Sequence, residues 1–228
     1  AVLGANFSRD SRQIVTASRD RSAKVWNPAD GELIATLSEG HDFLATTIAL
    51  FPDHKRFATA ALDNTTRVWD IATGVEQFRL NDTGRAAVVV ISRSGEWLVT
   101  GSSEGKAVVW DALTGNIRRD LPGHRGDVTA AAWSRDDRWL ATADSGGRIR
   151  VWEPAAGKLV WSADRHSSGV TGLAFSADGQ WLYSASNDQT VGCARAEDGV
   201  EDVKRIWKHP AGVAGMVLSD DGTVGLTY

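Results

Sequence analysis

The tetrapeptide KVWN at residues 24–27 decides how this chain folds, because it returns at nearly constant intervals. It reappears as RVWD at 67–70, as VVWD at 108–111 and as RVWE at 150–153. The tryptophans of the four copies, Trp26, Trp69, Trp110 and Trp152, are separated by 43, 41 and 42 residues. A further interval of 42 residues ends at Ala194, where the chain reads GCAR (192–195). The sequence is therefore built from repeats of about 42 residues.

A glycine that recurs in the same register shows that the fifth copy is present although its tryptophan is missing. It stands five residues after each tryptophan position, at Gly31, Gly74, Gly115, Gly157 and Gly199. Repeats of roughly 40–45 residues are typical of four-stranded propeller blades and also of two- or three-helix solenoid units. The local pattern has to decide between strands and helices.

Short segments rich in β-branched and aromatic residues favour strands. We predict strands over Ala86–Ile91, Ala107–Asp111, Val170–Phe175 and Trp181–Ala185. Dipeptides ending in glycine, such as Asp178-Gly179, supply the tight turns between them. No segment of twelve or more residues keeps a helical apolar period without a Gly, Pro or Asp-rich break, which argues against a helical solenoid.

Composition and charge fit a soluble globular protein. The chain has 228 residues, 42% hydrophobic and 24% charged, and its net charge of −4 gives no electrostatic reason to bind nucleic acid or an anionic membrane. The single cysteine, Cys193, cannot form an intramolecular disulfide, and we expect it to be a small buried hydrophobe. Because no leader and no 18-residue apolar run is found, we expect a cytoplasmic protein without nucleic-acid or membrane partners.

Essentially the whole chain resembles the WD40-repeat β-propeller family. The family pattern runs from Gly-His to Trp-Asp with a Ser/Thr and an Asp between them. The second unit has the full set, Gly40-His41, Thr59, Asp63 and Trp69-Asp70. The resemblance implies an all-β propeller of four-stranded antiparallel blades. It also implies that in each blade the Trp N–H donates to the Ser/Thr hydroxyl, which bonds the His, which in turn bonds the Asp.

Each of the other units lacks at least one member of this set. The members present are Thr16, Asp20 and Trp26 in the first unit, Thr100 and Trp110 in the third, His124, Thr142 and Trp152 in the fourth, His166, Ser184 and Asp188 in the fifth, and His209 and Thr227 in the last. Gly146 stands at the expected aspartate position of the fourth unit. Because Ala194 replaces a large buried ring, we expect the fifth blade to be the least stable complete one.

The repeat register also predicts the domain organisation. We expect one propeller domain over residues 1–228, with repeats at about 1–38, 39–80, 81–121, 122–164, 165–207 and an incomplete 208–228. Both ends fall inside a repeat, so we expect five full blades plus partial ends, as a fragment of a seven-blade ring. The open blade edges of such a fragment would favour self-association.

The sequence does not point to a catalytic, metal or cofactor site. His41, Thr59 and Asp63 have the residue types of a nucleophile–base–orienter triad, but the same constellation recurs from unit to unit, as expected of a structural network. Histidines placed one per blade would lie too far apart to share a zinc ion. We therefore expect a protein that is not an enzyme and that uses no cofactor and no metal.

The second unit differs from the others where WD40 propellers commonly bind peptides or proteins, on the face formed by the loop before the first strand and the loop between the second and third strands. It has Phe43, Leu44 and Leu62 at positions where the other units have small or polar residues. We hypothesise that these three side chains form a hydrophobic anchor for a partner, flanked by Arg19. The alternative is that Phe43 and Leu62 fold back and cap their own blade.

These features favour a non-catalytic protein–protein interaction scaffold that binds a peptide or protein on this face. Two alternatives stay open at this point. The chain could be the sensor or autoinhibitory arm of a larger signalling protein, such as a nucleotide-hydrolysing or kinase-like regulator. An enzyme whose propeller carries its own active site would need a cluster of titratable groups.

Overall fold

The protein is described by a computed structural model over residues 2–8, 10–20, 22–37, 41–43, 45–81, 86–219 and 225–227. Within these ranges the structure is all-β except for one 3-10 helix, η1 (Val203–Arg205). The chain forms two compact units, Ala1–Ser103 with Val108–Arg118, and Glu104–Ala107 with Arg119–Tyr228. No helix in the described part of the chain is long and apolar enough to cross a membrane.

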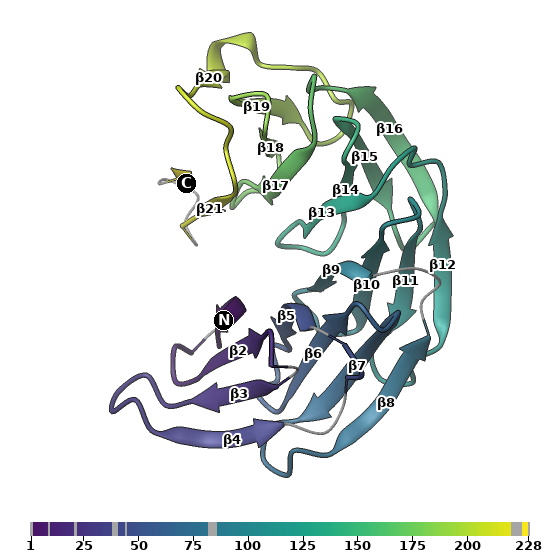
Figure 1. Cartoon of the computed structure of the whole chain (residues 1–228). Coiled ribbons are helices and arrows are strands. Elements are labelled where there is room, and N and C mark those ends of the chain that lie inside the picture. The colour runs from purple at the N-terminus through teal and green to yellow at the C-terminus, as the bar shows by residue number, and fades with distance from the viewer. Residues whose placement is uncertain are drawn as a thin grey trace. The chain divides into compact units, whose positions relative to one another are not determined.

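Three four-stranded antiparallel sheets follow one another along the first half of the chain (Figure 1). The first sheet consists of β1 (Val2–Phe7), β2 (Ile14–Ser18), β3 (Ala23–Trp26) and β4 (Leu33–Leu37). The second sheet consists of β5 (Ala45–Leu50), β6 (Arg56–Ala61), β7 (Thr65–Asp70) and β8 (Glu76–Asn81). The third sheet consists of β9 (Ala86–Ile91), β10 (Trp97–Ser102), β11 (Ala107–Asp111) and β12 (Ile117–Leu121). Consecutive strands pair in each sheet, so each sheet is an up-and-down meander.

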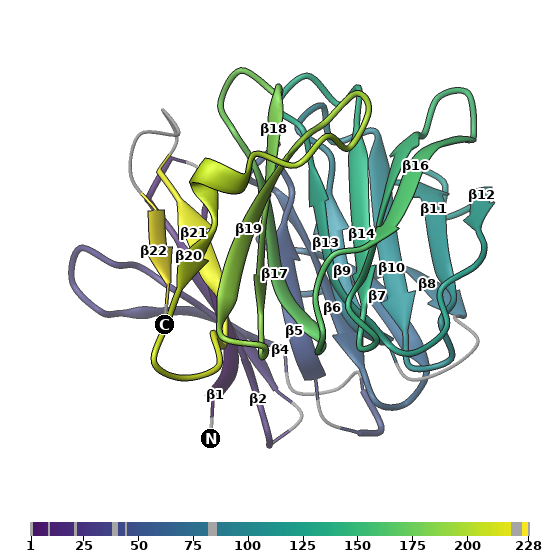
Figure 2. The same ribbon diagram turned by 90° about the horizontal axis from the view of Figure 1, so that it is seen from above.

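The second compact unit contains two further sheets of the same kind and a shorter one. The fourth sheet consists of β13 (Val128–Trp133), β14 (Leu140–Asp144), β15 (Arg148–Glu153) and β16 (Lys158–Asp164). The fifth sheet consists of β17 (Val170–Phe175), β18 (Trp181–Ser186), β19 (Thr190–Arg195) and β20 (Trp207–Lys208). The pair β21 (Met216–Leu218) and β22 (Gly225–Thr227) follows the fifth sheet (Figure 2).

The strands predicted from the sequence are confirmed. Ala86–Ile91, Ala107–Asp111 and Val170–Phe175 are strands with the predicted bounds, and the strand that begins at Trp181 extends one residue further, to Ser186. The recurring glycines lie in the left-handed region, with φ of 76° at Gly31, 70° at Gly74, 71° at Gly115, 65° at Gly157 and 72° at Gly199. A side chain there would be strained, which explains why glycine keeps the register even where the tryptophan is lost.

Apolar side chains fill the space between neighbouring sheets of each unit. In the first unit, Val15 and Val25 cluster with Phe57 and Trp69 of the second sheet, and Val68 clusters with residues of the third sheet. In the second unit, Ile149 and Val151 of the fourth sheet cluster with Val170 and Leu182 of the fifth. The first strands also contact one another in turn, β1 with β5 and β5 with β9, and likewise β13 with β17 and β17 with β21. Within each unit, neighbouring sheets therefore pack face to face through apolar side chains.

The fifth sheet departs from the others at its last strand. β15 and β16 pair along their whole length, from Arg148↔Asp164 to Glu153↔Lys158. β19 and β20 pair only at Thr190↔Lys208 and Val191↔Trp207. The helix η1 interrupts the chain just before β20, and its N-cap Asp202 accepts a hydrogen bond from Lys204 N.

Candidate functional site

A buried chain of hydrogen bonds ties the second sheet together. Trp69 Nε1 donates to Thr59 Oγ1 at 2.8 Å, Thr59 Oγ1 lies 2.7 Å from His41 Nε2, and His41 Nδ1 lies 2.9 Å from Asp63 Oδ2. A carboxylate only accepts, so His41 Nδ1 donates to Asp63, and His41 Nε2 accepts from the Thr59 hydroxyl. The hydroxyl oxygen then accepts the indole N–H. Every polar member of the chain has a partner, which matters because an unpaired buried group is costly.

Burial and hydrogen bonding together set the protonation states of this network. Burial lowers the pKa of the His41 imidazole and outweighs the hydrogen bond and charge of Asp63, which raise it. Burial raises the pKa of the Asp63 carboxyl, but hydrogen bonds from Thr65 and His41 lower it overall. The network is thus a neutral imidazole held between a hydroxyl and a carboxylate.

The fourth sheet has a complete network as well, and one sequence expectation about it is wrong. Trp152 Nε1 donates to Thr142 Oγ1 at 2.9 Å, and His124 Nε2 lies 2.8 Å from the same oxygen. His124 Nδ1 donates to Asp144 Oδ2 at 3.0 Å. We expected Gly146 to leave this unit without its aspartate. Asp144, at the end of β14, takes the role instead, and its other oxygen accepts from Gly146 N at 3.0 Å.

The first, third and last units carry parts of the network. Trp26 Nε1 donates to Thr16 Oγ1 at 2.9 Å, and Trp110 Nε1 donates to Thr100 Oγ1 at 2.8 Å. Asp20 lies exposed in the β2–β3 turn, where hydrogen bonds from Ser22 lower the pKa of its carboxyl to about 2. In the last unit, Thr227 Oγ1 lies 3.5 Å from His209 Nε2.

The fifth sheet keeps the polar chain without the tryptophan. His166 Nε2 lies 2.7 Å from Ser184 Oγ, and His166 Nδ1 lies 3.0 Å from Asp188 Oδ2. Ala194 occupies the strand position that Trp69 has in the second sheet, since it pairs with Leu182 as Trp69 pairs with Phe57. A cavity of about 300 Å³ lies beside these residues, between the fourth and fifth sheets.

The hydrogen-bonded side chains of Ser184, His166 and Asp188 resemble the arrangement of a nucleophile, a base and an orienting carboxylate in a catalytic triad. The distances are nevertheless those of the second sheet, where the corresponding hydroxyl accepts an indole N–H. The geometry is therefore that of the structural network.

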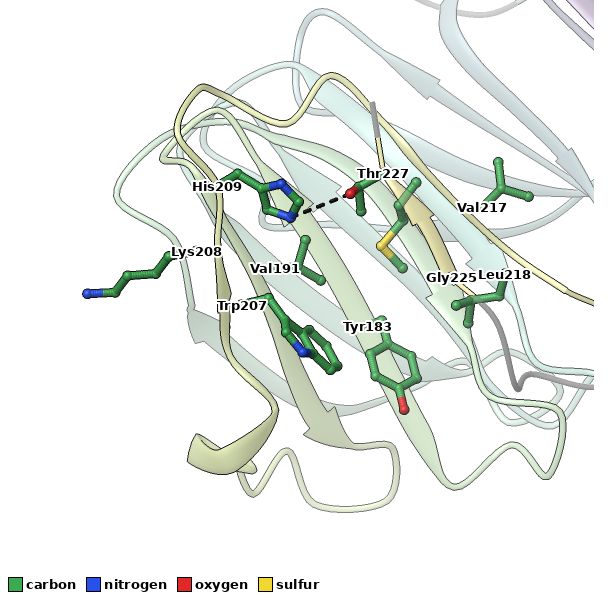
Figure 3. A pocket seen from close by; sticks show the side chains of 10 residues that line it. Tyr183, Val191, Trp207, Lys208, His209, Val217, Leu218, Gly225 and Thr227 are labelled. Carbon is green, nitrogen blue, oxygen red and sulfur yellow. Dashed lines mark hydrogen bonds between the residues drawn. The ribbon is translucent and has the colours of Figure 1, made fainter.

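A second cavity, of about 480 Å³, lies on the other side of the fifth sheet (Figure 3). Trp207 and Tyr183 lie close together at one end of it, with ring centroids 5.9 Å apart, and His209 and Thr227 lie at the other end. Met216 and Leu218 of β21 contribute apolar surface. This cavity is an apolar groove with a polar end.

The described residues that are predicted to bind a partner lie before β5 and in the β2–β3 and β6–β7 turns. Phe43 precedes β5 and is 60% exposed, so it does not cap its own sheet. Leu62 is half-buried in the β6–β7 turn, and Arg19 is exposed in the β2–β3 turn. Leu44 lies outside the described residues.

The structure also bears on metal binding and on the reactivity of the single thiol. Over the described ranges, no group of three or more His, Cys, Asp or Glu side chains could hold a metal ion. Cys193 is buried, and burial raises the pKa of its thiol. It is thus a small buried side chain with little thiolate character, as predicted.

A family comparison agrees with this geometry. The family model described as "WD domain, G-beta repeat" matches residues 1–27, 31–70, 83–111, 115–153 and 157–193, most of the chain. The chain belongs to the WD40 repeat family. The five four-stranded sheets of this WD40 protein are blades of a β-propeller.

Curated proteins similar to this WD40 chain match it over part of their length. The "Guanine nucleotide-binding protein subunit beta" of Nicotiana tabacum is 30% identical over 133 residues, which cover 54% of this chain and 35% of that protein. The "Small ribosomal subunit protein RACK1y" of Oryza sativa subsp. japonica is 32% identical over 108 residues, or 47% and 32% of the two chains. The "Pre-mRNA-processing factor 19 homolog 2" of Arabidopsis thaliana is 28% identical over 138 residues, or 58% and 26%. The matched region thus spans about a quarter to a third of these relatives.

Proposed function

We propose that this WD40 chain is a non-catalytic scaffold that binds a peptide or protein through the loop before β5 and the β6–β7 turn of the second sheet. The observation that carries the proposal is Phe43, an aromatic side chain that is 60% exposed beside the rigid network of His41. Two of the relatives are, by their names, a subunit of a guanine nucleotide-binding protein and a ribosomal subunit protein. Both names describe parts of larger assemblies, which supports a role in protein binding.

The loop that carries Phe43 is fixed at its base. Asp63 Oδ2 accepts from His41 Nδ1 at 2.9 Å and from Asp42 N at 3.0 Å. Asp42 precedes Phe43 and Asp63 follows Leu62, so one carboxylate holds together the two segments that present the apolar side chains. An anchor that is ordered before binding loses less conformational entropy when the partner docks.

We take Arg19 to be the polar neighbour of the anchor. Arg19 is exposed in the turn of the first sheet that corresponds to the Leu62 turn of the second. An aromatic or aliphatic anchor with polar neighbours is how interface energy is usually concentrated. We expect the partner to insert an apolar side chain against Phe43 and Leu62 and to offer an acceptor to Arg19.

The test is affinity capture with the immobilised chain, followed by calorimetry with the purified captured protein. The double variant Phe43→Ser/Leu62→Ser should bind at least about tenfold more weakly, because loss of a central anchor costs more than about 1.4 kcal/mol. Val75→Ser is the matched control, since Val75 is also 60% exposed but lies in the β7–β8 turn at the other end of the same sheet.

The control should bind like the wild type, and circular dichroism should show that both variants are folded. A partner that binds the double variant as tightly as the wild type would exclude this face as the binding site.

A further inference from the structure

The cavity between the fourth and fifth sheets lies where other sheets of this protein hold a tryptophan. In the second sheet, Thr59 pairs across the strands with Arg67, and Phe57 pairs with Trp69. In the fifth sheet, Ser184 pairs with Gly192, and Leu182 pairs with Ala194. Two large side chains are therefore replaced by a hydrogen atom and a methyl group at equivalent positions. Both replacements lie on one face of β19, because side chains two residues apart share a face.

The two polar residues nearest the missing ring are buried. Ser184 is 4% exposed and His166 is 7% exposed, and both line the cavity. Ile149 and Trp161 line it from the fourth sheet. Its volume of about 300 Å³ is at the lower end of the range for small-molecule sites, roughly 300–1,000 Å³.

One polar atom in the wall is ready to accept a hydrogen bond. His166 Nδ1 donates to Asp188, so the Ser184 hydroxyl proton points to His166 Nε2 at 2.7 Å. The remaining lone pair of Ser184 Oγ then faces the position of the missing ring. The corresponding oxygens accept indole N–H groups from Trp69 at 2.8 Å and from Trp152 at 2.9 Å.

We infer that this cavity binds a small planar aromatic molecule with a ring N–H, of the indole class, which donates to Ser184 Oγ. The ligand is a free small molecule that takes the place of the missing tryptophan ring. The lining combines apolar side chains, such as Ile149, Trp161 and Leu182, with polar ones, among them Arg165, Asp188 and Glu201. Sites that recognise such ligands pair apolar surface with a few placed polar groups. The inference concerns the fifth sheet and does not depend on the partner-binding face of the second sheet.

Titration of the whole chain with indole and with benzofuran tests the inference. Benzofuran has nearly the same shape but carries an oxygen in place of the N–H. Indole should bind saturably and about threefold to tenfold more tightly than benzofuran, as expected for one neutral hydrogen bond. Equal affinity for the two compounds, or no binding of indole, would overturn the inference.

Two variants locate the site. Ser184→Ala should remove the preference for indole over benzofuran, and Ala194→Trp should abolish binding of both compounds by filling the cavity. Thr59→Ala is the matched control, because it removes the corresponding hydroxyl in the second sheet and should leave the preference unchanged. Indole binding to Ala194→Trp with wild-type affinity would show that the ligand binds elsewhere, and the inference would fail.

Two further measurements keep the test decisive if a variant fails to fold. In the wild-type chain, nuclear Overhauser effects should connect indole protons to the Ala194 methyl group, and their absence at saturation would contradict the placement. N-acetyltryptophanamide carries the same ring on a peptide-like backbone. If it bound as tightly as indole, the ligand would be a tryptophan of a protein partner, contrary to the inference of a free small molecule.

Discussion

The second and fifth sheets have nearly the same polar network, but only the second has a tryptophan ring packed beside it. The ring-nitrogen distances are 2.7 and 2.9 Å around His41, and 2.7 and 3.0 Å around His166. Even the supporting contacts match, since Asp63 accepts from Asp42 N at 3.0 Å and Asp188 accepts from Ser167 N at 2.9 Å. Beside the hydroxyl of this network, the second sheet has the Trp69 ring, whereas the fifth sheet has a cavity.

The comparison separates two roles that the repeat motif combines. The histidine, hydroxyl and carboxylate hold the loop and the turn of a blade in place whether or not the indole is present. The tryptophan fills volume, because Trp69 is 5% exposed, stacks on Phe57 and belongs to the cluster between the first and second sheets. We therefore expect the loss of the ring to weaken a blade without changing its hydrogen-bond geometry.

The largest effect is expected from Trp69→Ala, which gives the second sheet the side chain that the fifth has. Removing a buried tryptophan costs about 3–5 kcal/mol, and Thr59 Oγ1 would also lose its indole donor. The free energy of unfolding in urea measures this loss. Trp207→Ala is the control. Because Trp207 is 47% exposed, its removal should lower the free energy of unfolding far less. Equal losses in the two variants would contradict the role given to the ring.

The reverse substitution, Ala194→Trp, should stabilise the protein. The new indole would fill the cavity and donate to Ser184 Oγ, as Trp69 does to Thr59. Filling a cavity commonly raises the free energy of unfolding by about 0.5–2 kcal/mol. A higher urea midpoint with an unchanged slope is expected. A lower midpoint would show that the space beside Ala194 does not accept the ring.

A smaller effect should appear as a pH dependence of the second sheet. Burial lowers the pKa of His41 in the folded protein, so the unfolded chain binds a proton at this site more readily. Stability should therefore be complete above about pH 6.5 and fall as the pH drops below it. For one group the loss at pH 5.5 is at most about 1.4 kcal/mol.

His41→Gln provides the comparison, because glutamine can bond Thr59 and Asp63 but does not titrate in this range. Between pH 7.5 and 5.5, the free energy of unfolding should fall more steeply with decreasing pH in the wild type than in the variant. Parallel slopes would mean that His41 does not take up a proton on unfolding in this range.

Much of the fold could be predicted from the sequence because residues with a fixed structural role recur at the same positions of each repeat. The positive φ after the third strand admits glycine best, so Gly199 marked the fifth unit in spite of Ala194. The spacing of the neighbouring units points to Gly146 as the aspartate position, whereas Asp144 lies two residues earlier, at the end of β14. The short interval from Thr142 to Asp144 was the signal available.

The candidate sites were less predictable. The sequence showed that Ala194 lacks a ring, but whether Ile149 and Trp161 close over the space depends on packing between sheets. The exposure of Phe43 likewise depends on how its loop is held. The sensor-arm alternative, the seven-blade ring and the cytoplasmic location stay predictions.

Native-state amide hydrogen exchange tests most directly whether the tryptophan ring determines the rigidity of a blade. The amides to compare are those of the β18–β19 ladder and their equivalents in β6–β7, which have the same strand pairing. Local opening exposes amides wherever few apolar contacts hold a sheet. We predict faster exchange in β18–β19 than in β6–β7, and a smaller difference in Ala194→Trp. Equal or slower exchange in β18–β19 of the wild type would contradict the account.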